Sequence, residues 1–370
     1  MDLMKTVQDL IRIPTVTGNS ADIMKAARYI QNSLKHTDTI VEIFESQKAS
    51  PVIFLRNTDT IDFDVIILGH IDVVPASENM FTPVIKDGKM YGRGTLDMKS
   101  FAAVALNTME YVTQHKLPIK FGVILSTDEE KGSLSTEAFL EAYPDIKARI
   151  VLDNDVGGDI TKIVSKCKNP VFVKLISTGK EAHGSTPWDG IDANELLFKT
   201  WQNIRKIYPY YAADLPQPQD TWFDTVHFAK ISGGDVANII SNHAEALLDF
   251  RLTENSNVEN LEKNLQNCLE EGVRYKIVSS STPVVMSEEN PDILDYKRFA
   301  ENILGKPIEF EHIGGATDSR SFAVKGSTVI MHSGSGDGMH ASGEYVDIES
   351  VKQIADIQIK FLEHLAKSKL

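Results

Sequence analysis

The sequence predicts an α/β fold, with a mixed, largely parallel sheet sandwiched by helices and a smaller α+β domain inserted into it. Three short apolar runs, at residues 65–68, 121–125 and 150–152, carry this prediction. Continuous runs of this length are typical of strands that are buried on both faces, as in a parallel sheet. Histidine or carboxylate residues follow each run, and ligands of open α/β sheets bind at the carboxyl ends of the strands. We therefore expect a functional site at that edge of the sheet.

Strands and helices alternate in the first part of the chain. The N-terminal segment places Val7, Leu10 and Ile11 on one helical face, and Pro14 then ends the helix. Asp87-Gly88 separates two apolar pairs, which predicts a β-hairpin. The other elements expected in this part are strands at 51–55, 65–68, 121–125 and 150–152 and helices at 101–112 and 135–142.

The pattern changes near Asn169-Pro170, where hydrophobic and polar residues begin to alternate, as in half-exposed antiparallel strands. The order of predicted elements becomes strand, helix, strand, strand, helix, strand, which is the split βαβ pattern of a small ferredoxin-like domain. The segments that support this order are strands at 171–175, 244–252 and 273–278, helices at 193–207 and 258–269, and a Pro-rich loop at 215–218.

The last part of the chain again predicts helices and a buried strand: a helix at 293–304, a strand at 327–331 and an amphipathic helix at 351–365. We therefore expect residues 1–168 and 285–370 to form one larger, catalytic domain, into which residues 169–284 are inserted.

Composition limits the classes of partner. The net charge of 38 − 52 = −14 argues against nucleic acid or an anionic membrane surface. No run approaches the ~18 apolar residues of a membrane span, and the N-terminus lacks the pattern of a signal peptide. A cytoplasmic enzyme is expected. The two cysteines, Cys167 and Cys268, are too few for a disulfide framework or a zinc finger.

Histidine and acidic residues gather where the predicted strands end. Such side chains are the usual nitrogen and oxygen ligands of metal ions, and closely spaced acids are costly unless a positive charge neutralises them. The residues at these positions and in two glycine-rich loops are His70, Asp72, Asp97, Asp128, Glu129, Glu130, Asp153, Asp155 and His340.

Each of these motifs also has an ordinary explanation. His70-x-Asp72 could form a surface turn, and Asp97 could cap the helix that follows it. The acids at 128–130 could form a solvated turn that Lys131 partly neutralises. Together, on the strand ends of one sheet, the motifs predict a metal site.

Five ordered motifs resemble the co-catalytic di-zinc hydrolase family. That family includes acetylornithine deacetylase, succinyl-diaminopimelate desuccinylase, aminoacylases, carboxypeptidase G and peptidase T. The motifs cover essentially the whole chain and lie at residues 69–75, 91–99, 127–130, 179–190 and 340–345.

The resemblance implies two Zn²⁺ ions per subunit, which Co²⁺ or Mn²⁺ can replace. Five side chains would hold them: His70 and Asp153 on one ion, Glu130 and His340 on the other, and Asp97 bridging both. Asp155 is the alternative to Asp153, which we prefer because it follows the apolar run directly.

The resemblance also implies the catalytic roles. Glu129 is the expected general base, which takes a proton from a water between the two ions and passes it to the leaving nitrogen. Asp72 is expected to accept the free ring N–H of His70 and fix its tautomer. His183 lies in the inserted domain, which would act as a lid and as the contact of a homodimer. There it would stabilise the oxyanion, often from the second subunit, unless it is an ordinary surface histidine.

Three further residues are candidates to bind the substrate. Asn238 matches the family's lid asparagine. Arg251 and Arg320 suit a substrate carboxylate because guanidinium groups bind carboxylates in a two-pronged geometry. Either arginine could instead form a structural salt bridge.

The expected function is therefore zinc-dependent hydrolysis of the amide bond of a small peptide or N-acyl amino acid. A peptidase of the dipeptidase or carboxypeptidase type is the first interpretation, and a deacylase such as acetylornithine deacetylase or succinyl-diaminopimelate desuccinylase is the alternative. A metal-binding protein without catalysis is disfavoured, because Glu129 and all five expected ligands are present. A nucleotide-binding protein is also disfavoured, because Gly92-Arg93-Gly94 is too short for a dinucleotide motif.

Overall fold

The computed structural model describes residues 1–47, 49–208 and 222–368, which fold into two compact units. Unit 1 comprises Met1–Ser165, Met286–Glu311 and Thr317–Leu370, and unit 2 comprises Lys166–Val285 and His312–Ala316. The domain boundaries expected at 168 and 284 lie within a few residues of these points. The Pro-rich loop expected at 215–218 lies outside the described residues.

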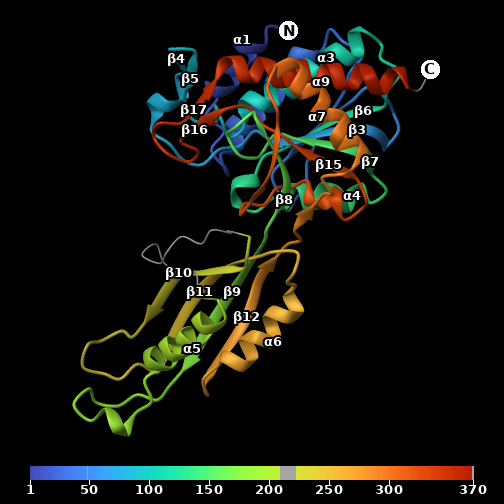
Figure 1. Ribbon diagram of the computed structural model, residues 1–370. Helices are drawn as coiled ribbons and strands as arrows, with labels where there is room; N and C mark the ends of the chain where they lie inside the picture. The colour runs from blue at the N-terminus through green and yellow to red at the C-terminus, as the bar shows by residue number, and fades with distance from the viewer. Residues whose placement is uncertain (48, 209–221, 369–370) are drawn as a thin grey trace. The chain divides into compact units, whose positions relative to one another are not determined.

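Most of a mixed nine-stranded sheet belongs to unit 1; its order is β1-β2-β6-β3-β7-β15-β8-β13, with β14 paired to β8 (Figure 1). The central strands β6, β3, β7 and β15 are parallel, and the flanking strands run antiparallel to their neighbours. The α/β class with a mixed sheet is confirmed. The strands are β1 Ile40–Phe44, β2 Val52–Arg56, β3 Asp62–His70, β6 Phe121–Ser126, β7 Lys147–Asp153, β8 Lys162–Cys167, β13 Val284–Val285, β14 Glu309–Ile313 and β15 Thr328–Met331.

Helices cover both faces of this sheet (Figure 1). One face packs against α1, α2, α3, α7 and α9 in a single hydrophobic core, and α4 and α8 lie on the other face. Every residue of β6 is buried, as its unbroken apolar run predicts. Each aliphatic side chain buried in this way contributes about 2 kcal/mol. The helices are α1 Leu3–Ile11, α2 Ser20–Leu34, α3 Lys99–Gln114, α4 Leu134–Ala142, α7 Pro291–Leu304, α8 Arg320–Ala323 and α9 Ile348–Lys367.

Local sequence sets the ends of these helices, as α7 illustrates. The side chain of Asn290 accepts hydrogen bonds from the first free backbone N–H groups, and Pro291 occupies the first helical position, where its missing N–H costs nothing. Gly305 ends the helix with a φ of +63°, a conformation that favours glycine.

A small antiparallel sheet of order β16-β17-β5-β4 completes unit 1. The hairpin predicted at Asp87-Gly88 is present, and both turn residues have positive φ, as a tight hairpin turn requires. Tyr91 at the end of β5 pairs with Tyr345 at the start of β17. The sheet therefore joins two loops that are about 250 residues apart in the sequence. Its strands are β4 Val84–Lys86, β5 Lys89–Tyr91, β16 Gly336–Asp337 and β17 Tyr345–Asp347.

Unit 2 is a four-stranded antiparallel sheet of order β10-β11-β9-β12 with two helices packed on one face (Figure 1). The predicted order of strand, helix, strand, strand, helix, strand is confirmed. The elements are β9 Asn169–Thr178, α5 Ala193–Ile207, β10 Thr225–Gly233, β11 His243–Leu252, α6 Val258–Cys268 and β12 Val273–Ser280.

No helix within the described ranges is both long and apolar enough to cross a membrane.

Candidate active site

His70 is the last residue of β3, at the carboxyl end of the central sheet. Its Nδ1 lies 3.0 Å from the main-chain oxygen of Asp72 and 3.4 Å from the Asp72 carboxylate. The closest acceptor for the ring N–H is thus the carbonyl group rather than the expected side chain. His70 Nε2 lies 3.0 Å from Asp97 Oδ1 and 3.7 Å from Asp155 Oδ1. When the ring is neutral and donates from Nδ1, the lone pair of Nε2 therefore faces these two carboxylates.

Asp97 lies in the loop between β5 and α3, and its two carboxylate oxygens face two different histidines. Oδ1 is 3.0 Å from His70 Nε2, and Oδ2 is 2.9 Å from His340 Nε2. The helix cap considered for Asp97 is not formed, because the N-cap of α3 is Met98. A Cβ atom at Gly92 would lie 2.9 Å from a main-chain oxygen, so the loop follows the tight path that its glycines predict.

His340 and Glu130 approach Asp97 from its other side. His340 Nε2 is 3.0 Å from Glu130 Oε2, while Glu130 Oε1 is buried and has no hydrogen-bond partner among the described residues. His340 has a φ of +62°, in the left-handed region, and belongs to the loop between β16 and β17. Since β17 pairs with β5, the loops of Asp97 and His340 arise from the same small sheet.

These side chains form two groups with Asp97 in common. The donor atoms of each group lie within 4.8 Å of one another, which suits metal bonds of about 2.0–2.2 Å to a shared ion. The first group is His70, Asp97 and Asp155, and the second is Asp97, Glu130 and His340.

Asp153, the preferred ligand from the sequence, belongs to neither group, whereas the alternative, Asp155, belongs to the first. Its Oδ1 accepts the backbone N–H of Asp155 at 2.8 Å, and its Oδ2 accepts the hydroxyl of Thr317. Burial and the neighbouring charge of Asp155 raise the pKa of Asp153 to about 6. Asp153 therefore supports Asp155, and Asp155 presents its carboxylate to His70.

Asp72 organises the two adjacent acids of the next strand end. Its carboxylate accepts the backbone N–H of Glu129 at 3.1 Å and that of Glu130 at 3.4 Å, and also the hydroxyl of Thr17 at 2.7 Å. With both amides fixed, Glu130 faces His340, whereas the Glu129 carboxylate has no hydrogen-bond partner in the described part of the chain. Burial and the charge of Asp155 raise the pKa of Glu129 well above its usual value.

The acids at 128–130 do not form the solvated turn considered from the sequence. Asp128 is buried and accepts the backbone N–H of Ser135 at 3.1 Å. Lys131 donates to the main-chain oxygen of Thr17 at 3.0 Å.

The residues present fit divalent cations. Burial and the charge of Asp97 raise the pKa of Glu130 to about 7, so a nearby cation would favour the ionised form of this carboxylate. The unpartnered oxygen of Glu130 is an acceptor that a cation would satisfy. Asp97, Glu130 and Asp155 with two imidazoles are the donor set that zinc and similar ions prefer.

The loop that carries Asp155 is fixed by long-range contacts. The Asn154 side chain donates to the main-chain oxygen of His332, and Gln358 donates to Asn154 at 2.9 Å. Burial lowers the pKa of His332 to about 4, so the ring is neutral and donates from Nε2 to the main-chain oxygen of Ile160 at 2.7 Å. The loop that carries Asp155 is therefore held by hydrogen bonds at Asn154 on one side and at Ile160 on the other.

His183 and Asn238 lie in two adjacent loops of unit 2. The backbone N–H of Gly184 donates to the main-chain oxygen of Asn238 at 2.8 Å. His183 Nδ1 accepts the backbone N–H of Ser185 at 3.1 Å, which places the proton of the neutral ring on Nε2. Both side chains are exposed.

The two candidate arginines differ in their partners. Arg251 pairs side-on with Asp249 through Nε at 2.9 Å and Nη2 at 3.0 Å, which favours the structural role considered for it. Arg320 Nη1 donates to the main-chain oxygen of Thr317 at 2.9 Å and lies 3.4 Å from Asp318 Oδ1. Its other N–H groups bind none of the described residues.

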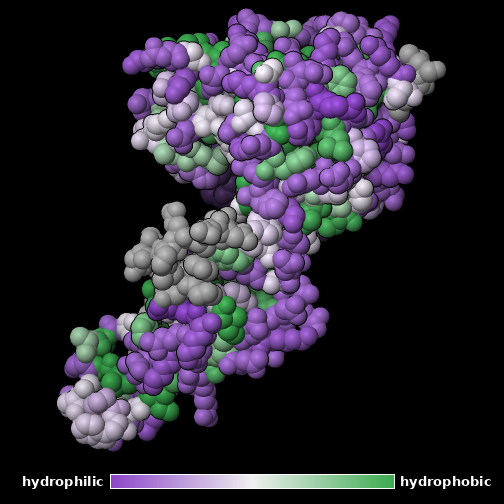
Figure 2. Space-filling model, in the orientation of Figure 1, coloured by the Kyte–Doolittle hydropathy of each residue, from purple (hydrophilic) through white to green (hydrophobic). Residues whose placement is uncertain are grey.

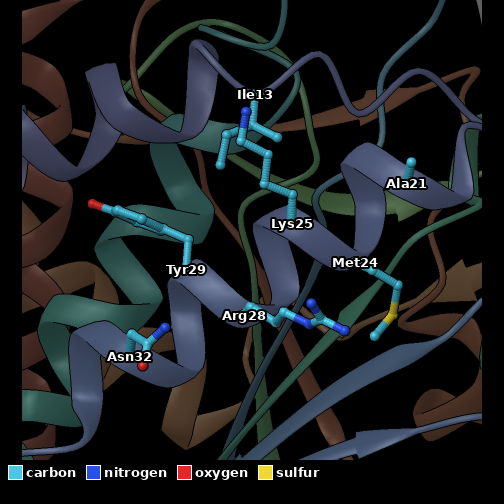
Figure 3. Close-up of a pocket in the computed structure, with 7 residues that line it drawn as sticks. All are labelled: Ile13, Ala21, Met24, Lys25, Arg28, Tyr29 and Asn32. Atoms are coloured by element: carbon cyan, nitrogen blue, oxygen red, sulfur yellow. The ribbon is translucent and has the colours of Figure 1, made fainter.

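A separate hollow of about 530 Å³ lies beside α2 and contains none of these side chains. Figure 3 shows its lining, Ile13, Ala21, Met24, Lys25, Arg28, Tyr29 and Asn32. Lys25 and Arg28 form no ion pair within the described ranges. The donor chemistry, rather than this hollow, identifies the candidate active site.

Two buried residues of the site received no role from the sequence. Glu344 and Arg93 form an ion pair beside the loops of Asp97 and His340. Both stand inside motifs that carried the family resemblance, but their pairing depends on a contact between residues 251 positions apart.

The profile of Peptidase family M20/M25/M40 matches residues 66–364. The succinyl-diaminopimelate desuccinylase of Helicobacter hepaticus is 26% identical, over 99% of this chain and 98% of its own. The metallo-carboxypeptidase Sso-CP2 of Sulfolobus solfataricus, an M20 protein, has a similar fold, with a TM-score of 0.81 at 18% identity over 99% of this chain and 100% of its own. The YxeP protein of Bacillus subtilis, a dinuclear metal binding peptidase of the same family, has a TM-score of 0.71 at 14% identity, over 100% of this chain and 98% of its own.

Proposed function

Since this chain belongs to peptidase family M20/M25/M40, we propose that it is a zinc-dependent hydrolase that cleaves the amide bond of a small peptide, as a dipeptidase or carboxypeptidase does. The position of Asp97, whose two oxygens face His70 and His340, carries this proposal. One Zn²⁺ ion would bind to His70, Asp97 and Asp155, and the other to Asp97, Glu130 and His340.

Two divalent cations in these positions would lower the pKa of a bound water and polarise the scissile carbonyl group. Glu129 would accept the proton of that water and deliver it to the leaving nitrogen. The nearby cations would favour its ionised form and oppose the effect of burial. His183 would donate from Nε2 to the oxygen of the scissile carbonyl as negative charge develops there.

Arg320 is the residue that we propose to bind a substrate carboxylate. Asp318 and the carbonyl group of Thr317 hold one edge of its guanidinium, and the N–H groups that bind no described residue are available for a second, two-pronged contact. Arg251 is already paired with Asp249 and is not assigned this role. We propose that Asn238, beside the loop of His183, contacts the substrate as well.

A hydrolysis screen of the zinc-loaded protein tests this function. Dipeptides should be cleaved faster than N-acetyl, N-succinyl or N-formyl amino acids. Arg320→Ala should lower kcat/KM about 10- to 100-fold for substrates with a free carboxylate, as expected from the loss of a charged hydrogen bond, and much less for the corresponding amides. Arg28→Ala is the matched control, because Arg28 is exposed on α2 and forms no ion pair with the residues that the structure describes. Equal losses on acids and amides would assign Arg320 to the scaffold, and no cleavage of any substrate would reject the function.

Deacylation of an N-acyl amino acid is the second candidate function. The observation that favours it is the match to a desuccinylase along nearly the whole chain. Faster release of acetate or succinate than of amino acids in the same screen would select it. A role in metal-dependent association alone is disfavoured by the Glu129 carboxylate, which accepts no hydrogen bond from any described residue.

We also propose that the protein forms a homodimer through unit 2. The loops of His183 and Asn238 expose Trp188, which is 77% accessible, together with Ile191 and Ile239. Figure 2 shows hydrophobic residues on the visible surface of unit 2, and exposed apolar patches mark association surfaces. In addition, β10 is an edge strand. Sedimentation velocity should give the mass of two chains, and Trp188→Glu should shift it toward one. The mass of a single chain at every concentration would contradict the proposal.

A further inference from the structure

We infer that Arg93 and Glu344 are positioning residues that hold the loop of Asp97 against the loop of His340 and so fix the distance between two metal ligands. This inference rests on the metal centre of the proposed function. Neither residue has a ligand atom in the centre, so both act through the backbone of the residues that do.

Glu344 is 1% exposed and uses both carboxylate oxygens within the site. Oε1 accepts the backbone N–H of Leu96 at 2.9 Å and that of Asp97 at 3.2 Å. Oε2 accepts a hydrogen bond from Nη1 of Arg93 at 2.5 Å. The carboxylate therefore binds the Asp97 loop at three points, one of which is the amide of the bridging residue itself.

Arg93 continues the connection to the histidine. It is 3% exposed, and its Nη2 donates to the main-chain oxygen of Ala341, the residue after His340, at 3.3 Å. The main-chain oxygen of Glu344 also accepts the backbone N–H of Gly92 at 3.1 Å. Each loop thus contributes one charged side chain that binds the backbone of the other.

The small sheet alone would leave both loops free beyond their bases. Asp97 lies six positions after the end of β5, and His340 lies five positions before the start of β17. Metal–ligand bonds tolerate errors of only about 0.2 Å, and support of the ligands by outer residues typically changes metal affinity 10- to 100-fold. The Arg93–Glu344 pair supplies that support where the sheet does not.

The test is the zinc affinity of the metal-depleted full-length protein, measured by competition with a chromogenic chelator. Glu344→Gln keeps the size of the side chain but turns an amide NH₂ toward Arg93 and leaves the guanidinium unpaired. We expect it to weaken the binding of at least one ion 10- to 100-fold and to change the visible spectrum of the Co²⁺-loaded protein. Val112→Ala, at a buried position of α3 outside both loops, controls for loss of stability.

A charge-neutral double variant tests the same positioning role if Glu344→Gln does not fold. In Arg93→Met with Glu344→Gln, the amide oxygen can still accept the two N–H groups, and no unpaired charge remains. It should fold and should bind zinc more tightly than the Glu344→Gln single variant, but less tightly than the parent, since the link to Ala341 is lost. Parental affinity and parental Co²⁺ spectra in both variants, or the same losses in Val112→Ala, would overturn the positioning role. A parent protein that binds fewer than two ions would instead reject the proposed function.

Discussion

Replacing Glu129 with glutamine should leave both metal ions bound and lower kcat by about 10²–10⁴-fold, the usual contribution of a general base. The amide of glutamine cannot accept a proton from water at neutral pH. The substitution nevertheless preserves the side-chain volume, and Glu129 donates only its backbone N–H to Asp72, so Glu130, the neighbouring proposed ligand, keeps its position. Elemental analysis and steady-state kinetics on the same preparation measure the two quantities.

The same substitution at Glu137, an exposed residue of α4, is the matched control and should have no effect on either quantity. Equal activity in Glu129→Gln and the parent would remove Glu129 from the mechanism. Loss of zinc together with activity would instead make it a ligand. We expect zinc to be retained, because Glu129 belongs to neither group of clustered donor atoms. The zinc content therefore distinguishes a general base from a ligand.

The strands could be predicted from the sequence wherever burial is complete on both faces. The run at 121–125 is β6, and the run at 65–68 is the buried part of β3, because parallel central strands need apolar residues at every position. The chain order of unit 2 was predictable for the complementary reason: its strands have one covered and one open face and therefore alternate. The pairing of β5 with β17 was not predictable, since three-residue strands carry no periodicity.

The residues of the site were predicted better than their geometry. His70, Asp97, Glu130 and His340 come together, but only the structure places one oxygen of Asp97 toward each histidine. The pair of Arg251 with Asp249 could have been anticipated, because residues two apart on a strand lie on the same face.

The choice between Asp153 and Asp155 depended on information that local sequence does not contain. The apolar run ends at Leu152, and either acid could then turn toward the site. The path of the following loop decides between them, and that path is set by Asn154, whose partners His332 and Gln358 are 178 and 204 residues away. Distance from a strand end alone therefore does not show which acid faces His70, because such contacts set the path of the backbone.

Asp155→Asn should therefore remove one of the two zinc ions and lower kcat/KM more than 100-fold, while Asp153→Asn should retain both ions. Replacing Asp155 takes a charged donor away from His70 and Asp97, a larger change than the roughly 10- to 100-fold effect of an outer residue. In Asp153→Asn the amide oxygen can still accept the N–H of Asp155, and the hydroxyl of Thr317 can turn to accept from the new NH₂ group. Zinc stoichiometry after gel filtration, measured beside the circular dichroism of each variant, distinguishes the two. If Asp153→Asn lost an ion and Asp155→Asn kept both, Asp153 would be the ligand after all, and the loop at 153–160 would have to take a different path when metal binds.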